Sequence, residues 1–173
     1  LFFEEIKEFL GDVNLSDNAI TYVDVSLYPI KFQPPLILFL IQYFKKLTGE
    51  KIFLMDECWH LLERHADFVA NCFRTFRKEK ASGLAISQGI SDFLSIPLGE
   101  AIWLNSHFKI LFRQEITGTN PLSEFEYKKL QNIYSSKGNY SEFLVLADHL
   151  KKTMRFFPSE LEYELFTTDK DDL

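Results

Sequence analysis

Apolar positions along this chain recur first at helical and then at strand spacing, and the two patterns follow one another. Leu36–Leu47 carries apolar side chains at helical spacing, and so does Trp59 to about residue 80, at positions 59, 62, 66, 69, 73 and 76. Short apolar runs typical of strands lie at Ala19–Ser26, Ile52–Met55 and Leu84–Ser87. This order predicts an α/β fold, with a parallel sheet and crossover helices.

Proline and glycine suggest where these helices begin and end. Pro35 suits the first turn of the helix that begins there, and Gly49 is expected to stop it. Gly83 is expected to stop the second helix. An amphipathic helix is also predicted at Leu1–Leu10, closed by Gly11.

The second half of the chain predicts a different arrangement. Ser123 and Glu126 form a capping box that begins a helix reaching about residue 134. The other expected elements are a short helix at Pro97–Asn105, a strand at Phe108–Phe112, and an antiparallel strand pair at Tyr140–Ala147 and Thr153–Phe157. The acidic tail at 169–173 is expected to fray.

Composition excludes some classes of protein. The chain has 173 residues, 46% of them hydrophobic, which suffices for a buried core. A formal net charge of −6 argues against a chain wrapped in nucleic acid by itself. Cys58 and Cys72 form no C-x-x-C pair and are interpreted as reduced, partly buried thiols. The longest apolar run, from Leu36 to Phe44, is too short to cross a bilayer.

Two adjacent carboxylates end the run Lys51–Met55. At the carboxyl end of a parallel strand, Asp56 can hold Mg²⁺ of a nucleotide and Glu57 can orient an attacking water, the pattern called Walker B. Alternatively, the two are solvated acids at a helix start, where the helix dipole favours them. The matching phosphate loop, G-x-x-x-x-G-K-[ST], does not occur in the sequence. The chain is therefore expected to carry one half of an ATPase site, the Walker B half, without the phosphate loop.

Three further side chains extend this hypothesis. Gln88 closes the next predicted strand, where its amide could sense a γ-phosphate or the water, or could simply be a polar strand end. Arg74 and Arg77 lie near the end of the predicted helix that follows Asp56 and Glu57, and a guanidinium there can spread the charge of a transferring phosphoryl group. The alternative is a solvated basic helix terminus.

The ordered set of motifs resembles one family. Met55–Leu62 resembles the DE-x-W-x-L-L block of the conjugative-transfer ATPases of type IV secretion systems, the VirB-type and TraC-type proteins of the HerA/FtsK motor group. The further matches are Arg77-Lys78 with Gly83, Ser87-Gln88 with Asp92, Asn105 with Gln114, and the tail segments Tyr140–Phe143, Arg155–Phe157 and Leu165–Thr168. The resemblance covers roughly residues 19 to 168.

This resemblance implies a RecA-like P-loop NTPase domain that uses ATP and Mg²⁺ and works as a hexamer. The implied roles are Mg²⁺ binding through water for Asp56, activation of the lytic water for Glu57, sensing for Gln88, an arginine finger for Arg77 or else Arg74, and contact with the site for Arg113 or Gln114. The sequence lacks the phosphate loop, so residues 1–173 are interpreted as the carboxyl-terminal portion of one ATPase domain, inactive alone.

The family also implies partners and a location. These are other hexamer subunits, components of the secretion channel and the DNA or protein that is transferred, at the cytoplasmic face of the bacterial inner membrane. Two alternatives stay open: a fragment of a DNA-translocating motor of the HerA/FtsK type, and a non-catalytic interaction domain that binds a partner through its sheet edge and aromatic surface.

Overall fold

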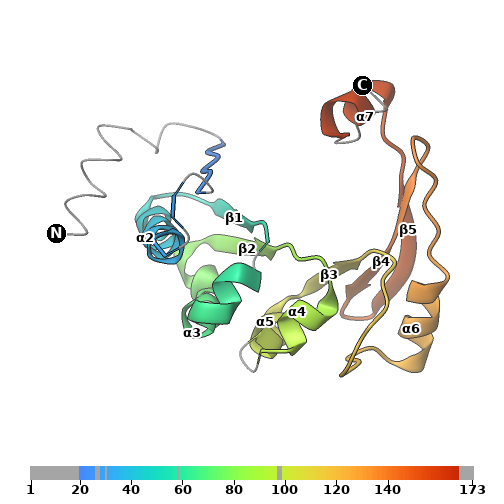
Figure 1. Cartoon of the computed structure of the whole chain (residues 1–173), viewed down its shortest axis with the longest axis horizontal. Coiled ribbons are helices and arrows are strands. Elements are labelled where there is room, and N and C mark those ends of the chain that lie inside the picture. The colour runs from blue at the N-terminus through green and yellow to red at the C-terminus, as the bar shows by residue number, and fades with distance from the viewer. Residues whose placement is uncertain (1–19, 26–27, 30, 58, 97–98, 168–173) are drawn as a thin grey trace.

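The structure has two parts, each built on its own small sheet (Figure 1). It is a computed structural model that describes residues 20–25, 28–29, 31–57, 59–96 and 99–167. The predicted helix at Leu1–Leu10, the tail at 169–173 and Cys58 lie outside these residues. The α/β class, with a parallel sheet and crossover helix followed by antiparallel strands, is confirmed.

The parallel part contains the elements expected from the apolar pattern. They are α2 (Gln33–Lys46), β1 (Lys51–Met55), α3 (Trp59–Thr75), the 3₁₀ turn η2 (Phe76–Glu79) and β2 (Ala81–Ala85). The two strands pair in parallel from Lys51↔Ala81 to Met55↔Ala85, with α3 as the crossover between them. Helix α2 begins at Gln33, two residues before the predicted start, and keeps proline in its first turn.

The predicted strand at Ala19–Ser26 is wrong for the residues that the structure describes. Residues 20–25 form no strand, and Ile20 and Tyr22 are 89% and 86% exposed. A run of β-branched and aromatic residues becomes a strand only where a neighbouring strand satisfies its backbone groups. Within the described part of the chain, the parallel sheet has only β1 and β2.

Gly83 does not end the preceding helix, and the predicted strand began too late. The 3₁₀ turn ends at Glu79 and is capped by Lys80, whose backbone is left-handed with φ of 50°, and β2 starts at the next residue. Gly83 lies inside β2, where a Cβ atom would come within 2.6 Å of Cε2 of Phe76. The glycine is therefore needed for close packing of a buried ring on the strand.

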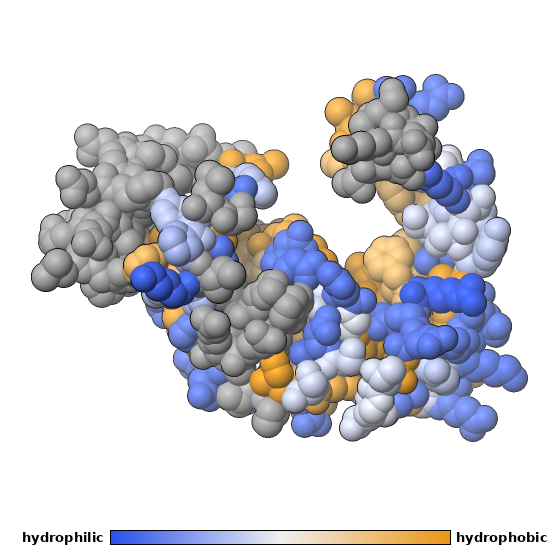
Figure 2. Space-filling view, viewed as in Figure 1, coloured by the Kyte–Doolittle hydropathy of each residue, from blue (hydrophilic) through white to orange (hydrophobic). Residues whose placement is uncertain are grey.

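Among the described residues, helices cover only one face of the parallel sheet. Ile41 of α2, Val69 and Cys72 of α3, and Phe76 pack with Met55 in one core. On the opposite face Ile52, Leu54, Leu84 and Ile86 are 77%, 62%, 45% and 39% exposed. Apolar atoms also reach the surface on the side of the molecule seen in Figure 2.

The antiparallel part follows through two short helices, α4 (Ile90–Leu94) and α5 (Gly99–Asn105). Its strands β3 (Phe108–Leu111), β4 (Ser141–Ala147) and β5 (Leu150–Phe156) pair in that order. Helix α6 (Glu124–Gln131) covers the sheet, and Leu130 and Leu144 at its core are 0% exposed. The predicted strand pair is confirmed, and β3 joins it as a third strand.

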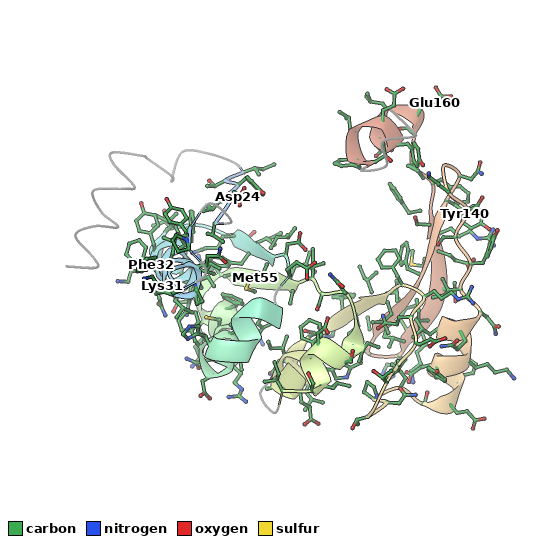
Figure 3. All side chains as sticks on the ribbon, viewed as in Figure 1. Asp24, Lys31, Phe32, Met55, Tyr140 and Glu160 are labelled. Atoms are coloured by element: carbon green, nitrogen blue, oxygen red, sulfur yellow. The ribbon has the colours of Figure 1, made fainter. Side chains whose placement is uncertain are left out.

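A last helix, α7 (Glu160–Phe166), was not predicted from the apolar pattern. It begins with a capping box of Ser159 and Glu162, but it contains no buried residue. Figures 1 and 3 show it beyond the end of the β4–β5 pair, near the label of Glu160, and apart from both sheets. Among the described residues, no helix is both long and apolar enough to span a membrane.

Candidate functional site

The carboxyl ends of β1 and β2 bring together the polar residues that the sequence singled out. Asp56 and Glu57 follow Met55, while Ile86, Ser87 and Gln88 follow β2. The backbone amide of Ile86 donates to the carbonyl oxygen of Met55 at 2.9 Å, so the chains stay paired past the strand ends. Nε2 of Gln88 then donates to Oε1 of Glu57 at 3.1 Å. Residues 31 positions apart in the chain thus meet.

The turn that carries the two carboxylates has an unusual backbone. Glu57 adopts φ of 49°, a left-handed conformation that costs a non-glycine residue of order 1 kcal/mol or more. Its backbone amide donates to Oδ1 of Asp56 at 3.0 Å, which turns that carboxylate toward the peptide that follows it. Asp56 is exposed and Glu57 is half-buried, so solvent and a ligand can reach both.

A third carboxylate, that of Asp92, holds the turn that carries Gln88. Its Oδ2 atom accepts from the hydroxyl of Ser87 and, at 3.1 Å, from the backbone amide of Gly89. The sequence showed Asp92 only as part of a family motif. Its position three residues after Gly89 is the spacing of a helix cap, and that signal could have predicted this bond.

Gln114 lies behind the same turn. Its Oε1 accepts from the backbone amide of Ile90 at 2.8 Å, and its Nε2 donates to the carbonyl oxygen of Phe112 at 3.3 Å. Nε2 of Gln131 in α6 donates to the carbonyl oxygen of Gln114 at 3.1 Å. These bonds link the turn to the antiparallel part. Arg113, the residue before Gln114, is exposed.

Arg74 and Arg77 lie at the opposite edge of the parallel sheet. Arg74 is in the last turn of α3 and Arg77 is in η2, just before β2 begins, and both are exposed. Glu57 lies beyond the other end of the strands, and a strand of this length spans about 13 to 17 Å. The structure therefore does not bring either arginine to the carboxylates of its own chain.

Asp56 offers a single carboxylate at the carboxyl end of β1. In the described ranges, no group of three or more His, Cys, Asp or Glu side chains could hold a metal. Mg²⁺ commonly binds through one or two carboxylates, several waters and the phosphates of a nucleotide. An exposed carboxylate such as that of Asp56 fits this mode of binding.

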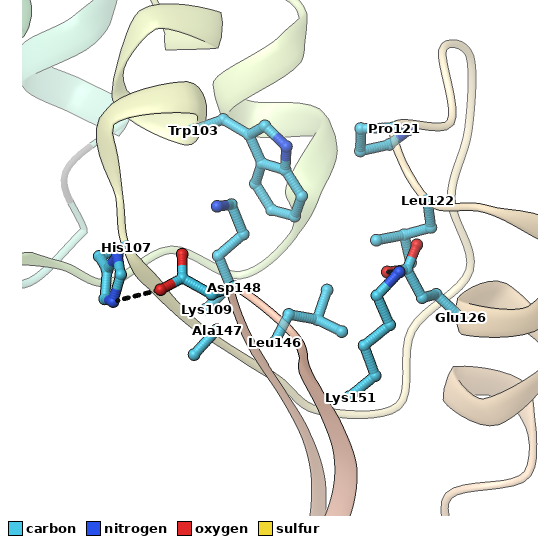
Figure 4. Close-up of a pocket in the computed structure, with 10 residues that line it drawn as sticks. All are labelled: Trp103, His107, Lys109, Pro121, Leu122, Glu126, Leu146, Ala147, Asp148 and Lys151. Atoms are coloured by element: carbon cyan, nitrogen blue, oxygen red, sulfur yellow. Dashed lines mark ion pairs between the residues drawn. The ribbon is translucent and has the colours of Figure 1, made fainter.

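A separate hollow lies between α5, α6 and the β4–β5 turn (Figure 4). Its polar side chains already contact one another: Nε2 of His107 lies 3.3 Å from Oδ2 of Asp148, and Nζ of Lys151 lies 2.8 Å from Oε1 of Glu126. Lys109 donates to the carbonyl oxygen of Ser106 at 2.6 Å, and burial lowers its pKa. These polar groups are already paired within the chain, so the hollow offers few of them to a ligand.

Comparison with known proteins agrees with the resemblance predicted from the motifs. The sequence model of the TraG P-loop domain matches residues 26–173. Among curated proteins, none matches the chain. The solved structure of VirB4 of Thermoanaerobacter pseudethanolicus is similar in fold, with a TM-score of 0.59 and 22% sequence identity. The similarity covers 80% of this chain, which spans 41% of the length of that one.

Proposed function

The chain belongs to the TraG P-loop domain family, and from this premise we propose that it is the Walker B portion of an ATPase that energises type IV secretion or conjugation. The family is one of P-loop NTPases, for which nucleotide binding is the general property. In this proposal, residues 1–173 are the carboxyl-terminal portion of the ATPase domain, and the nucleotide is ATP with Mg²⁺.

One observation carries the proposal. Gln88 donates to Glu57 at 3.1 Å, at the carboxyl ends of two adjacent parallel strands. Open α/β sheets bind their ligands at this edge. A carboxylate and an amide held together there can share one water: the carboxylate takes its proton, and the amide orients it toward a phosphoryl group. Asp56, one residue earlier, is the proposed Mg²⁺ residue, and Mg²⁺ supplies charge neutralisation on the phosphates.

The arginines fit this proposal only if they act on a neighbouring subunit. Arg77 lies at the edge of the sheet opposite Glu57, so it cannot reach the water site of its own chain. It is exposed, as is required of an arginine finger that enters the site of an adjacent subunit in a ring. We assign the finger to Arg77, with Arg74 as the second choice, and leave Arg113 and Gln114 at the rim of the site.

In this proposal, most contacts with the phosphates are made by residues other than these 173. No G-x-x-x-x-G-K-[ST] motif occurs in the 173 residues, and that loop supplies the amide cradle and the lysine for the phosphates. We therefore expect the chain by itself to bind ATP weakly and to hydrolyse none. Its proposed partners are the other hexamer subunits, the secretion channel at the inner membrane and the transferred DNA or protein.

A mixing experiment tests the proposal in a polypeptide that also contains the phosphate loop. Glu57→Gln should bind ATP with unchanged affinity in calorimetry but show no turnover, because the water loses its base. Arg77→Ala should also be inactive alone. A mixture of the two variants should regain activity, since some sites then combine an intact Glu57 with an intact Arg77 from the neighbour.

The outcomes separate the alternatives. Normal turnover by Glu57→Gln removes the catalytic assignment altogether. Failure of the mixture to regain any activity, with ring assembly verified, argues against action between subunits. No ATP binding by the extended polypeptide would favour the interaction-domain alternative, for which the open apolar face of the parallel sheet is the supporting observation.

A further inference from the structure

We propose that Asp92 is a positioning residue that aims Gln88 at Glu57, with Ser87 as its essential partner. The inference rests on the proposed function, because it assigns the residues that hold the sensor side chain of that site. It follows from the bonds around the turn after β2, where the residues on both sides of Gln88 are tied to one carboxylate oxygen.

Two hydrogen bonds to Asp92, from Ser87 and from Gly89, hold the residues on either side of Gln88, and we call this arrangement the clamp. Ser87 binds Oδ2 of Asp92 through its side chain, and Gly89 binds the same atom through its backbone amide at 3.1 Å. Gln88 lies between these two anchors, and its side chain extends to Glu57. Fixing the residues before and after Gln88 restricts its backbone, and therefore the direction in which its side chain leaves the turn.

A carboxylate suits this role because both donors converge on it. Hydrogen bonds to an ionised acceptor are about twice as strong as those between neutral groups. Asparagine at the same position keeps one acceptor oxygen but loses the charge, so it should hold the turn less firmly. Alanine removes the acceptor, and it also removes the cap of α4, because Asp92 is the third residue of that helix.

A substitution at Ser87 can distinguish the positioning of Gln88 from the capping of α4. The hydroxyl of Ser87 contributes to the clamp, but the cap of α4 is the bond between Asp92 and the amide of Gly89. Ser87→Ala therefore removes one anchor and leaves the helix cap in place. Ser95, an exposed serine at the other end of α4, provides a matched control.

The turn is also anchored from its far side. Gln114 accepts the backbone amide of Ile90 at 2.8 Å, and Gln131 of α6 in turn donates to the carbonyl oxygen of Gln114 at 3.1 Å. The clamp thus rests on a link to the antiparallel part, so the position of Gln88 depends on both sheets.

The first test uses the 173-residue chain and needs no activity. Nuclear magnetic resonance of the side-chain amide of Gln88 should show it near Glu57 in the unmodified chain and in Ser95→Ala. In Ser87→Ala and Asp92→Ala, the amide should lose its contacts with Glu57 and take the shifts of a solvated glutamine, with Asp92→Asn in between. Unchanged Gln88 resonances in Ser87→Ala and Asp92→Ala overturn the inference.

The second test uses the polypeptide that contains the phosphate loop. Ser87→Ala and Asp92→Asn should lower kcat on the order of tenfold to a hundredfold, as expected when a catalytic group is misplaced, with KM for ATP unchanged. A purely structural role would lower thermal stability and leave kcat per folded molecule unaltered. If Glu57→Gln abolishes turnover while both variants keep full kcat, the positioning role is wrong and the proposed function stands. If Glu57→Gln keeps turnover, the proposed function fails, and the resonance experiment still decides the clamp.

Discussion

The two parts of the molecule use acidic residues in opposite ways. In the antiparallel part, Glu126 accepts from the backbone and hydroxyl of Ser123 and pairs with Lys151 at 2.8 Å. Glu142 accepts from the backbone amide of Tyr134 and from Nε of Arg155, both at 2.8 Å. In the parallel part, Asp56 is exposed at the end of a strand and Glu57 meets the amide of Gln88.

The electrostatics of the two parts differ accordingly. Although partial burial opposes it, the hydrogen bonds from Lys151 and Ser123 lower the pKa of Glu126 to about 2. The bond from the Tyr134 amide, followed by that from Arg155, lowers the pKa of Glu142. Carboxylates engaged in this way stabilise a fold and have little capacity left for a ligand. Acidic residues with a function are better sought where the carboxylate stays at the solvent.

The largest effect is expected from filling the close contact in the parallel part. Gly83→Val places a side chain where a Cβ atom alone would lie 2.6 Å from the ring of Phe76, which is 3% exposed. Although valine favours strands, we expect a loss of about 1 to 3 kcal/mol of unfolding free energy from overpacking. Urea unfolding should show this loss as a lower midpoint concentration.

Ser82→Val is the matched control, because Ser82 is the exposed neighbour in the same strand. It should unfold at the same urea concentration as the unmodified chain or slightly higher. Equal midpoints for Gly83→Val and Ser82→Val would contradict the packing argument. A separate first transition in Gly83→Val would show that the two parts, each with its own core, unfold independently.

A smaller effect on stability, seen only at acidic pH, should come from Glu126. Its folded pKa of about 2 lies below the ordinary 4.5, so the ionised form contributes stability above pH 4.5. That contribution should be lost as the pH falls from about 4.5 to about 2. Melting temperatures measured across this range should fall for the unmodified chain, and fall less steeply for Glu126→Gln, which keeps the capping geometry.

Glu124→Gln, in the same turn of α6 and exposed, controls for general charge effects. Its pH profile should run parallel to that of the unmodified chain. Because Lys151 is 44% exposed, solvent screening should keep the effect of Glu126 modest. Identical profiles for Glu126→Gln and Glu124→Gln would place the acid sensitivity elsewhere, with Glu142 as the next residue to examine.

Local sequence patterns predicted where helices and strands form better than they predicted which elements pair or pack together. The run at Ile52–Met55 and the capping box at Ser123 and Glu126 appear where expected, because each is set by residues close in sequence. The run at residues 20–25 has equally good strand residues but no strand, since pairing depends on distant backbone. Gly83 was misinterpreted because its reason, the ring of Phe76, is a packing contact.

The candidate site shows the same contrast between what local motifs indicate and what distant packing decides. The motifs pointed to Glu57 and Gln88, and the parallel pairing of β1 with β2 brings the two side chains together. The spacing alone did not indicate that Arg77 lies at the opposite edge of the sheet, because this depends on where the crossover helix ends. The contacts of Asp92 were also missed, since the motif included the residue but did not indicate the two hydrogen bonds that converge on it.

The smallest effect should come from two serines with the same local role in different surroundings. Ser123 caps α6, whose Leu130 is fully buried, while Ser159 caps α7, which buries no residue. Ser123→Ala should lower the unfolding free energy by about 1 kcal/mol, a typical cost of losing a cap. Ser159→Ala should loosen α7, seen as faster amide exchange from Glu160 to Phe166, with no change in global unfolding, because a helix with no buried residue adds little to the core. Equal lowering of the urea midpoint by both substitutions would contradict this expectation and would mean that α7 packs on the rest of the chain in solution.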